Sequence, residues 1–394
     1  MIAARLLDVL LALALLVFLG EGLRNGIARS LGAVLGIIAG GVVAFLAIPF
    51  LAGVVPDPFW RVAVVVAVSI ALLIGGHALG GRIGRGIRDR GPEEIGLGSR
   101  LAGAATNGII AALTLVLVAG GVGSLGIPLV SQAISGSYVV RAIDSVTPAP
   151  VDALLSRVRA AVLEEGLPAV GDALGGVVDS PGIPDLPTDT DPLGAAAQSV
   201  VRIGGTAFAC GQNQTGTGFV VAPDRIVTNA HVVAGVDQPI VEAPNGQTLE
   251  GIVVYLDPVD DLAVVAVDGL LVPALDLAPA LDAGSEAVVQ GYPFGGPFTV
   301  GAAEVLAVST ESLPDIYGSA RAPREVYTLA ALVQPGNSGG PLLSLDGEVA
   351  GVVFARSADD AELGYAMTNT ELQPVADAAA DLASPVSSGS CVRG

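Results

Sequence analysis

The chain has 394 residues, a length that accommodates two or three ordinary domains. Apolar residues make up 52% of it and charged residues only 14%, which excludes a disordered chain and argues against an ordinary soluble protein. The formal net charge of −20 argues against a nucleic acid as the partner, because binding phosphates requires a basic face.

The charges divide the chain near residue 130. Residues 1–130 carry nine arginines and six acidic residues, whereas residues 131–394 carry nine arginines and 32 acidic residues. The chain contains no lysine. The two parts therefore have opposite net charge, and we expect them to lie in different surroundings.

The first part contains four apolar segments, at about residues 6–19, 31–55, 60–79 and 101–122. The last three reach the roughly 20 residues that cross a bilayer, and the first is shorter. A signal peptide could also begin with Arg5 and an apolar run, but the later segments favour a multi-pass domain. We therefore expect residues 1–130 to form an α-helical transmembrane domain of about four spans in the lipid bilayer.

Polar and small residues in these segments have separate interpretations. Gly36, Gly40 and Gly103 predict close packing between helices. An ionisable or polar group within a span suggests a function, and this applies to Asn107 and His77. We expect His77, which follows two glycines at a helix end, to face lipid headgroups instead.

The arginines indicate the orientation of this domain. The segment 81–100 carries the largest cluster, formed by Arg82, Arg85, Arg88, Arg90 and Arg100. Positively charged loops stay in the cytoplasm. The fourth span then delivers the acidic part of the chain to the extracytoplasmic (periplasmic) side.

Residues 131–195 are predicted to be a linker. Apolar residues at helical spacing indicate a short amphipathic helix at 151–165. Four prolines and several aspartates at 180–192 indicate an extended, exposed stretch. Because this stretch is tethered close to the domain that follows, the chain could cleave itself there.

Residues 196–394 change to short β-rich runs separated by turns. Ten such runs are predicted, at residues 200–203, 217–221, 225–228, 251–256, 262–267, 287–290, 327–333, 340–345, 348–354 and 364–367. Many short strands at this spacing predict an all-β domain of two packed β-barrels. A helix is predicted at 369–382, with Asn369 or Thr370 as its N-cap.

Two motifs in this part carry chemistry: Thr228-Asn229-Ala230-His231 and the segment from Gln334 to Pro341, which reads QPGNSGGP. Acyl transfer needs a nucleophilic oxygen, a base, an acid that orients the base, and N–H donors for the oxyanion. A serine flanked by glycines, Ser338, can expose its hydroxyl on a tight turn. Gly336 lets the chain turn so that its N–H and that of Ser338 can form an oxyanion hole.

The general base can be assigned by counting the histidines, whereas the acid that orients it cannot be assigned by counting. The chain has two histidines, and His77 belongs to the membrane part, so only His231 can serve Ser338. The candidates for the acid are Asp257, Asp260, Asp261 and Asp268. Asp261 is favoured because it directly precedes an apolar strand, and Asp260 stays open as the alternative.

The motifs TNAH, DLA and GNSGGP, in this order, resemble the trypsin/chymotrypsin-like serine proteases, and the HtrA-related branch in particular. The resemblance implies a double β-barrel chymotrypsin-like fold, with His231 as general base, Asp261 as its orienting acid and Ser338 as nucleophile. It also implies peptide or protein substrates in the cell envelope, and no cofactor or metal. Asn337 stands where digestive members have an aspartate, so activation by a newly cut N-terminus is not expected.

The complete layout resembles the MarP-like family of actinobacterial membrane-anchored serine proteases, whose membrane part is similar to the colicin V production (CvpA) family. This resemblance implies a role in envelope stress and acid resistance. Within the trypsin-like family the specificity pocket has its floor about six residues before the nucleophile, here Leu332, and its wall near Val353 and Phe354. No acid lies there, so an uncharged P1 residue is expected.

The two cysteines, Cys210 and Cys391, both lie in the part expected outside the membrane, which predicts a disulfide bond. Two other functions remain open from the sequence. The protease fold could be a catalytically silent scaffold, or the protease could regulate a membrane domain that itself acts in transport.

Overall fold

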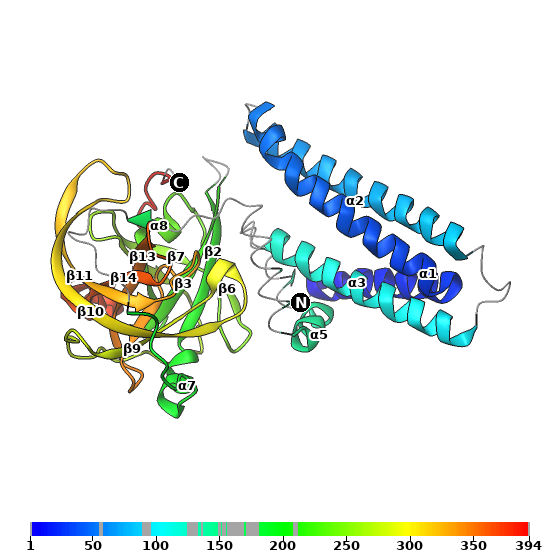
Figure 1. Cartoon of the computed structure of the whole chain (residues 1–394). Helices are drawn as coiled ribbons and strands as arrows, with labels where there is room; N and C mark the ends of the chain where they lie inside the picture. Colours follow the sequence, from blue (N-terminus) through cyan, green and yellow to red (C-terminus); the bar gives the residue numbers. More distant parts are fainter. Residues whose placement is uncertain are drawn as a thin grey trace. The chain divides into compact units, whose positions relative to one another are not determined.

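The computed structural model describes residues 2–54, 58–88, 96–123, 133–134, 137–148, 151, 155, 169–170, 181–207 and 212–392. The chain forms two compact units (Figure 1). The helical unit comprises Met1–Gly120 and Ser137–Thr147, and the strand unit comprises Gly121–Gly136 and Pro148–Gly394. Each unit is described by itself.

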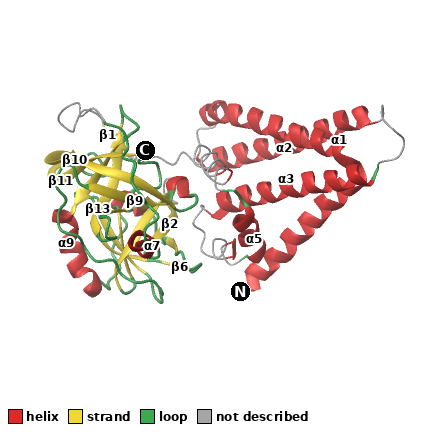
Figure 2. Cartoon of the chain, turned by 60° about the horizontal axis from the view of Figure 1, so that its bottom comes forward, coloured by secondary structure: helices red, strands yellow, loops and turns green. Residues whose placement is uncertain are grey.

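Three long helices form most of the helical unit: α1 (Ile2–Val54), α2 (Pro58–Arg88) and α3 (Leu97–Gly123). Gly26 interrupts α1 with a φ of 70° and a ψ of 177°, and the chain turns sharply there (Figures 1 and 2). The two halves of α1 contain the first two predicted apolar segments. Among the described residues, Ala4–Ala44 and Leu97–Val116 are long and apolar enough to cross a membrane.

Glycines bring α1 and α2 into backbone contact. A Cβ atom on Gly36 would overlap the carbonyl oxygen of Gly76, and one on Gly80 would overlap that of Gly32. A Cβ atom on Gly40 would overlap the backbone of α2 in the same way. Only residues without a side chain permit this approach, as the predicted close packing requires.

The helical unit extends past the boundary expected near residue 130. The helix α5 (Tyr138–Val146) belongs to it, and its start is held by Asp8 of α1. The Asp8 carboxylate accepts hydrogen bonds from the Ser137 hydroxyl at 2.6 Å and from the Val139 N–H at 3.0 Å. The helix predicted at 151–165 lies almost entirely outside the described residues.

Within the strand unit, an irregular stretch at 181–190 leads into the short helix α7 (Asp191–Ala197). Its first sheet has the strand order β6-β5-β2-β3-β4-β8-β7. The strands are β2 (Val200–Ala207), β3 (Gln212–Ala222), β4 (Arg225–Thr228), β5 (Ile240–Glu242), β6 (Thr248–Glu250), β7 (Ile252–Asp257) and β8 (Leu262–Ala266). All of its pairings are antiparallel.

The second sheet has the order β1-β13-β12-β9-β10-β11-β14. Its strands are β1 (Ala169–Val170), β9 (Glu286–Gly291), β10 (Thr299–Pro314), β11 (Arg321–Ala331), β12 (Pro341–Leu343), β13 (Val349–Ser357) and β14 (Leu363–Thr368). An additional pairing of β13 with β14 closes β9–β14 into a ring. The described pairings of the first sheet contain no such closure, so only the second sheet is a closed barrel by its hydrogen bonds.

The helix α9 (Asn369–Ala378) follows β14 and continues into a 3₁₀ turn, Ala379–Asp381. Its N-cap is Thr368, whose hydroxyl accepts a hydrogen bond from the Thr370 N–H at 3.2 Å. The expected caps, Asn369 and Thr370, are therefore wrong by one or two residues. The Asn369 side chain instead donates to two backbone carbonyls of the second sheet region.

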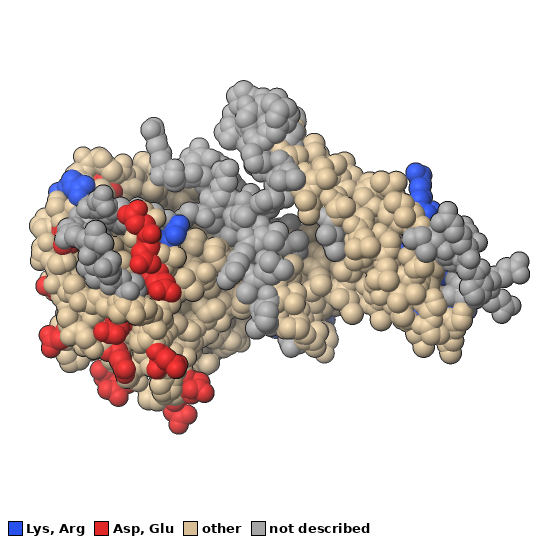
Figure 3. Space-filling view, viewed as in Figure 1, with Lys and Arg blue, Asp and Glu red and all other residues tan. Residues whose placement is uncertain are grey.

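A shared core holds the two sheets together. Phe219 and Leu262 of the first sheet and Leu343 and Val352 of the second belong to one cluster of buried side chains. Each sheet also has a core of its own. Acidic side chains are spread over the surface of the strand unit (Figure 3), in keeping with the charge of this half.

Candidate active site

The motif Thr228-Asn229-Ala230-His231 is hydrogen-bonded to Asp261. His231 lies on α8 (Ala230–Val233), and its ring Nδ1 is 2.8 Å from Oδ2 of Asp261. The backbone N–H of His231 donates to Oδ1 of the same carboxylate at 2.9 Å. The Ala230 N–H and the Asn229 amide donate to the Asp261 carbonyl oxygen at 3.1 and 2.9 Å. Backbone and side-chain hydrogen bonds thus fix the imidazole and the carboxylate relative to each other.

The backbone of the β7–β8 turn decides which aspartate faces His231. Asp261 ends this turn with a φ of 54°, a left-handed conformation that costs a residue with a side chain about 1–2 kcal/mol. It is only 4% exposed, and His231 is 8% exposed. Asp260 is half-buried, and its N–H donates to the Asp257 carboxylate at 3.1 Å. The structure brings Asp261, and not Asp260, to His231.

Ser338 lies in a turn that glycines shape. Gly336 and Gly339 have φ values of 94° and 79°, in the left-handed region that favours glycine. A Cβ atom on Gly339 would overlap the Thr217 carbonyl oxygen and the Thr228 hydroxyl. The Thr217 N–H donates to the Ser338 carbonyl oxygen at 2.8 Å. The turn is therefore pressed against β3 and β4 of the first sheet.

The same turn offers two N–H donors. The Phe294 N–H donates to the Pro335 carbonyl oxygen at 2.5 Å. In a trans peptide the N–H points opposite to the C=O, so the Gly336 N–H points away from Phe294. Within the described part of the chain, neither the Gly336 N–H nor the Ser338 N–H has an acceptor. Two unpaired donors beside a serine are what an oxyanion hole requires.

The serine turn and the histidine helix meet at Gly216 of β3. A Cβ atom on Gly216 would lie 2.6 Å from both Val232 methyl carbons and 3.1 Å from the Ser338 carbonyl oxygen. Val232 is the neighbour of His231 on α8. The hydrogen bonds between described residues include none from the Ser338 hydroxyl to the His231 ring, a bond that commonly tightens only when substrate binds.

A buried cation interacts electrostatically with the acid of this site. Arg324 of β11 is 3% exposed, donates to the Pro314 carbonyl oxygen at 2.7 Å, and lies 5.7 Å from the centre of the Phe354 ring. Burial lowers the pKa of Arg324, and the negative charge of Asp261, followed by that of Asp260, opposes this. Burial also raises the pKa of Asp260. The positive charge of Arg324 therefore interacts favourably with the carboxylates of Asp261 and Asp260.

The three predicted pocket residues differ in whether their side chains are exposed. Leu332 is 49% exposed and precedes the serine turn. Val353 binds that turn through its backbone, since its N–H donates to Gly340 at 2.9 Å and its carbonyl accepts from Gly339 at 2.8 Å. The side chains of Val353 and Phe354 are buried in the two cores that cover opposite faces of β13. Leu332 is therefore the one of the three whose side chain is open to a ligand.

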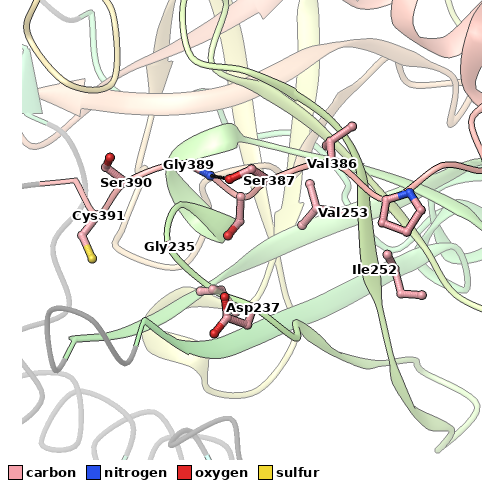
Figure 4. Close-up of a pocket in the computed structure, with 12 residues that line it drawn as sticks. Gly235, Asp237, Ile252, Val253, Val386, Ser387, Gly389, Ser390 and Cys391 are labelled. Atoms are coloured by element: carbon pink, nitrogen blue, oxygen red, sulfur yellow. Dashed lines mark hydrogen bonds between the residues drawn. The ribbon is translucent and has the colours of Figure 1, made fainter.

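The C-terminal segment 383–392, which we call the strap, crosses the first sheet (Figure 4). The Val386 N–H donates to the Val253 carbonyl oxygen at 2.9 Å, and the Gly235 N–H donates to the Ser388 carbonyl oxygen at 3.0 Å. A cavity of about 560 Å³ lies between the strap and the sheet, and neither His231 nor Ser338 lines it. This cavity is therefore separate from the candidate active site.

The strap contains Cys391 close to its end. Cys391 forms a disulfide bond, and the described chain contains no free cysteine. Cys210, its expected partner and the only other cysteine in the sequence, lies outside the described residues. The Cys391 sulfur lies next to Gly235, two residues after α8, where it would be 3.0 Å from an added Cβ atom.

Thr217 and Arg324 are site residues that the sequence analysis did not identify. The Thr217 hydroxyl donates to the Gly336 carbonyl oxygen at 2.6 Å and accepts from the Tyr292 N–H at 3.0 Å, so it ties the first sheet to the serine turn. The sequence signal that could have pointed to Thr217 is its position between Gly216 and Gly218, just before an apolar run. Arg324 has no local signal, because its partners are distant in sequence.

Comparison with known proteins identifies the families that the chain resembles. Residues 216–352 match the family described as trypsin-like peptidase domain, and residues 7–148 match the family described as colicin V production protein. Serine protease Rv3671c of Mycobacterium tuberculosis (strain H37Rv) is 40% identical over 272 residues, which are 67% of each chain. Putative serine protease HhoB of Synechocystis sp. is 38% identical over 170 residues, 41% of this chain and 39% of the relative.

A solved structure is similar as well. The crystal structure of the Rv3671c protease in its active form matches with a TM-score of 0.52 and 40% identity, over 56% of this chain and 99% of that one. The chain is a serine endopeptidase, and it belongs to the family of serine protease Rv3671c, with a colicin V production domain followed by a trypsin-like peptidase domain.

Proposed function

We propose that the chain cleaves protein or peptide substrates of the cell envelope through His231, Asp261 and Ser338. The Ser338 hydroxyl attacks the scissile carbonyl, and His231 takes its proton and returns it to the leaving amine. Asp261 holds the imidazole in the required tautomer, and the N–H groups of Gly336 and Ser338 stabilise the oxyanion. The observation that carries this proposal is the bonding of both Asp261 carboxylate oxygens to His231 beside the serine turn.

The proposal includes a multi-pass membrane domain with four spans. α1 has 53 residues and would be about 80 Å long if straight, against a hydrocarbon core of about 30 Å. The break at Gly26 divides it into two segments that each suffice for one span. With α2 and α3 this gives four spans, in agreement with the apolar pattern of the sequence.

The proposed orientation places the arginine-rich ends of α2 and α3 in the cytoplasm and the strand unit outside. The disulfide of Cys391 favours this placement, because such bonds persist in oxidising compartments. A relative from Halomonas elongata named as a probable periplasmic serine endoprotease, 35% identical over 41% of this chain, also favours it. From the resemblance to the MarP-like family, the proposal also includes a role in envelope or acid stress.

Labelling by a fluorophosphonate probe tests the proposed nucleophile. The full-length protein is expected to be labelled, the Ser338→Ala variant not at all, and Ser384→Ala, which changes an exposed serine of the same unit, as strongly as the parent. Labelling that persists in Ser338→Ala would refute the assignment of the nucleophile.

The same gel tests self-cleavage in the stretch 181–190. The active chain is expected to release a fragment that ends within these residues, and the Ser338→Ala variant is expected to stay intact.

The P1 preference is expected to be uncharged, because the predicted pocket residues Leu332, Val353 and Phe354 carry no charge and the exposed one, at the floor, is Leu332. A peptide library cleaved by the full-length protein measures this directly. Leu332→Asp is expected to move the preference toward Arg, since a carboxylate at the pocket floor pairs with a guanidinium. A parent profile dominated by Arg at P1 would show that another part of the chain forms the pocket.

A further inference from the structure

The helical unit contains a cavity of about 240 Å³ between its three long helices. It lies beside the break at Gly26, where α1 resumes its helical course with Arg29 and Ser30. α2 contributes His77, Arg82 and Arg85 to the lining, and α3 contributes Asn107. Interrupted helices in membrane proteins commonly border ligand sites, because irregular backbone there must line a cavity or be buried in protein.

The cavity is basic. Three arginines line it, and the carboxylate of Glu21 is the single acidic group among the lining residues. The ion pairs found between described residues include none at Arg29, Arg82 or Arg85. Arg29 is held in place by Asn25, whose side-chain oxygen accepts a hydrogen bond from its guanidinium. The cavity therefore has an excess of fixed positive charge and free guanidinium donors.

Buried polar atoms at the cavity have no partner. The Ser30 hydroxyl, on a residue only 1% exposed, and His77 Nδ1 make no hydrogen bond to any described residue. Leaving such a buried group unpaired is unfavourable, so it usually has a hydrogen-bond partner. His77 therefore does not face headgroups at the helix surface, as the sequence suggested, but lines a cavity that can pair it with a ligand.

We propose that this cavity binds a phosphate group. Arginine presents a planar fork of donors that matches phosphate oxygens, and three of them with a histidine and a serine hydroxyl suit an anion of more than one charge. Basic pockets between transmembrane helices take the headgroups of anionic lipids. The glycines that bring α1 and α2 together also shape the site, since Gly81 leaves room for the Arg29 side chain beside it.

Binding to the full-length Ser338→Ala protein in detergent tests the proposal. The probes are inorganic phosphate and dihexanoyl phosphatidylglycerol, with dihexanoyl phosphatidylcholine as the zwitterionic comparison. Trp60 is the only tryptophan of the chain and belongs to α2, so its fluorescence reports thermal unfolding of the helical unit. We expect phosphatidylglycerol, inorganic phosphate or both to raise the unfolding temperature in a saturable way, and phosphatidylcholine to do so less.

The double variant Arg29→Gln/Arg82→Gln is expected to weaken binding at least about tenfold, because it removes two charged donors. The matched control is Arg24→Gln/Arg100→Gln, which removes the same charge from exposed arginines that do not line the cavity and should change affinity less than about twofold. Arg85→Gln, at an exposed lining residue, is a milder variant that keeps the test valid if the double variant unfolds.

The two probes distinguish the source of the phosphate. If inorganic phosphate competes with the lipid, the site recognises the phosphate group alone; if only the lipid binds, the site recognises a lipid headgroup. Both results support the proposal when the cavity variants weaken binding and the control does not. Absence of saturable binding by either probe, or equal loss in the control and cavity variants, would overturn it.

Discussion

Asp261→Asn is expected to lower kcat by about 10⁴-fold, a rise of about 5 kcal/mol in the activation free energy. The asparagine oxygen can still accept from the His231 N–H, so the turn should keep its shape. Its amide NH₂ would take the place of Oδ2, 2.8 Å from the ring Nδ1, and would donate to that nitrogen. The imidazole would then carry its proton on Nε2 and could not accept one from Ser338.

Asp260→Asn is the matched control for this substitution. Burial raises the pKa of Asp260, so the protein already disfavours a charge at this position, and a neutral asparagine is expected to change kcat less than about threefold. The rate of fluorophosphonate labelling, measured beside peptide hydrolysis, checks both variants. Loss of activity in Asp260→Asn with retention in Asp261→Asn would transfer the role to Asp260.

Gly339→Ala is expected to destabilise the strand unit by roughly 3–6 kcal/mol. The left-handed φ costs about 1–2 kcal/mol for a residue with a Cβ atom. That atom would also overlap the Thr217 carbonyl oxygen and the Thr228 hydroxyl, which are hydrogen-bonded to each other at 2.7 Å. Separating this buried pair and displacing the turn adds roughly 2–4 kcal/mol.

Gly246→Ala is the control that isolates the steric part of this effect. Gly246 has a similar φ of 84°, but a Cβ atom there would meet no atom within 4 Å, so only the backbone cost of about 1–2 kcal/mol remains. Amide hydrogen exchange of β8 measures the opening free energy of this unit. Both variants are compared in the Ser338→Ala background, which prevents self-cleavage. Equal exchange rates in the two variants would show that the turn can move away from the first sheet at little cost.

The elements that the sequence predicted best are those with a periodic apolar pattern. The long helices and most of the short strands were predicted because apolar residues recur at the period of each element. β1, β5, β6 and β10 were not predicted, because they are very short or contain few buried apolar residues: β10, for example, buries only Ala303, Val305 and Leu313 among its 16 residues. Their pairing partners in the sheets supply the stability that local composition does not show.

The candidate catalytic residues also divide into those that the local sequence could identify and one that it could not. His231 and Ser338 could be chosen from the sequence because the chain has one other histidine, in the membrane part, and one serine between glycines in such a turn motif. These properties depend on residues that adjoin in the chain. The choice among four aspartates could only be argued from the neighbouring strand.

Three features became visible only in the tertiary structure. The left-handed backbone at Asp261 turns its carboxylate to α8, Thr217 connects β3 with the serine turn, and the positive charge of Arg324 interacts with Asp260 and Asp261. Each depends on residues between about 30 and 120 positions apart, which approach because the two sheets bury a common core. The cavity around His77 also depends on tertiary packing: the sequence alone indicated an apolar, arginine-flanked helical domain, and only the packing of α2 and α3 against the broken helix α1 brought its polar groups together.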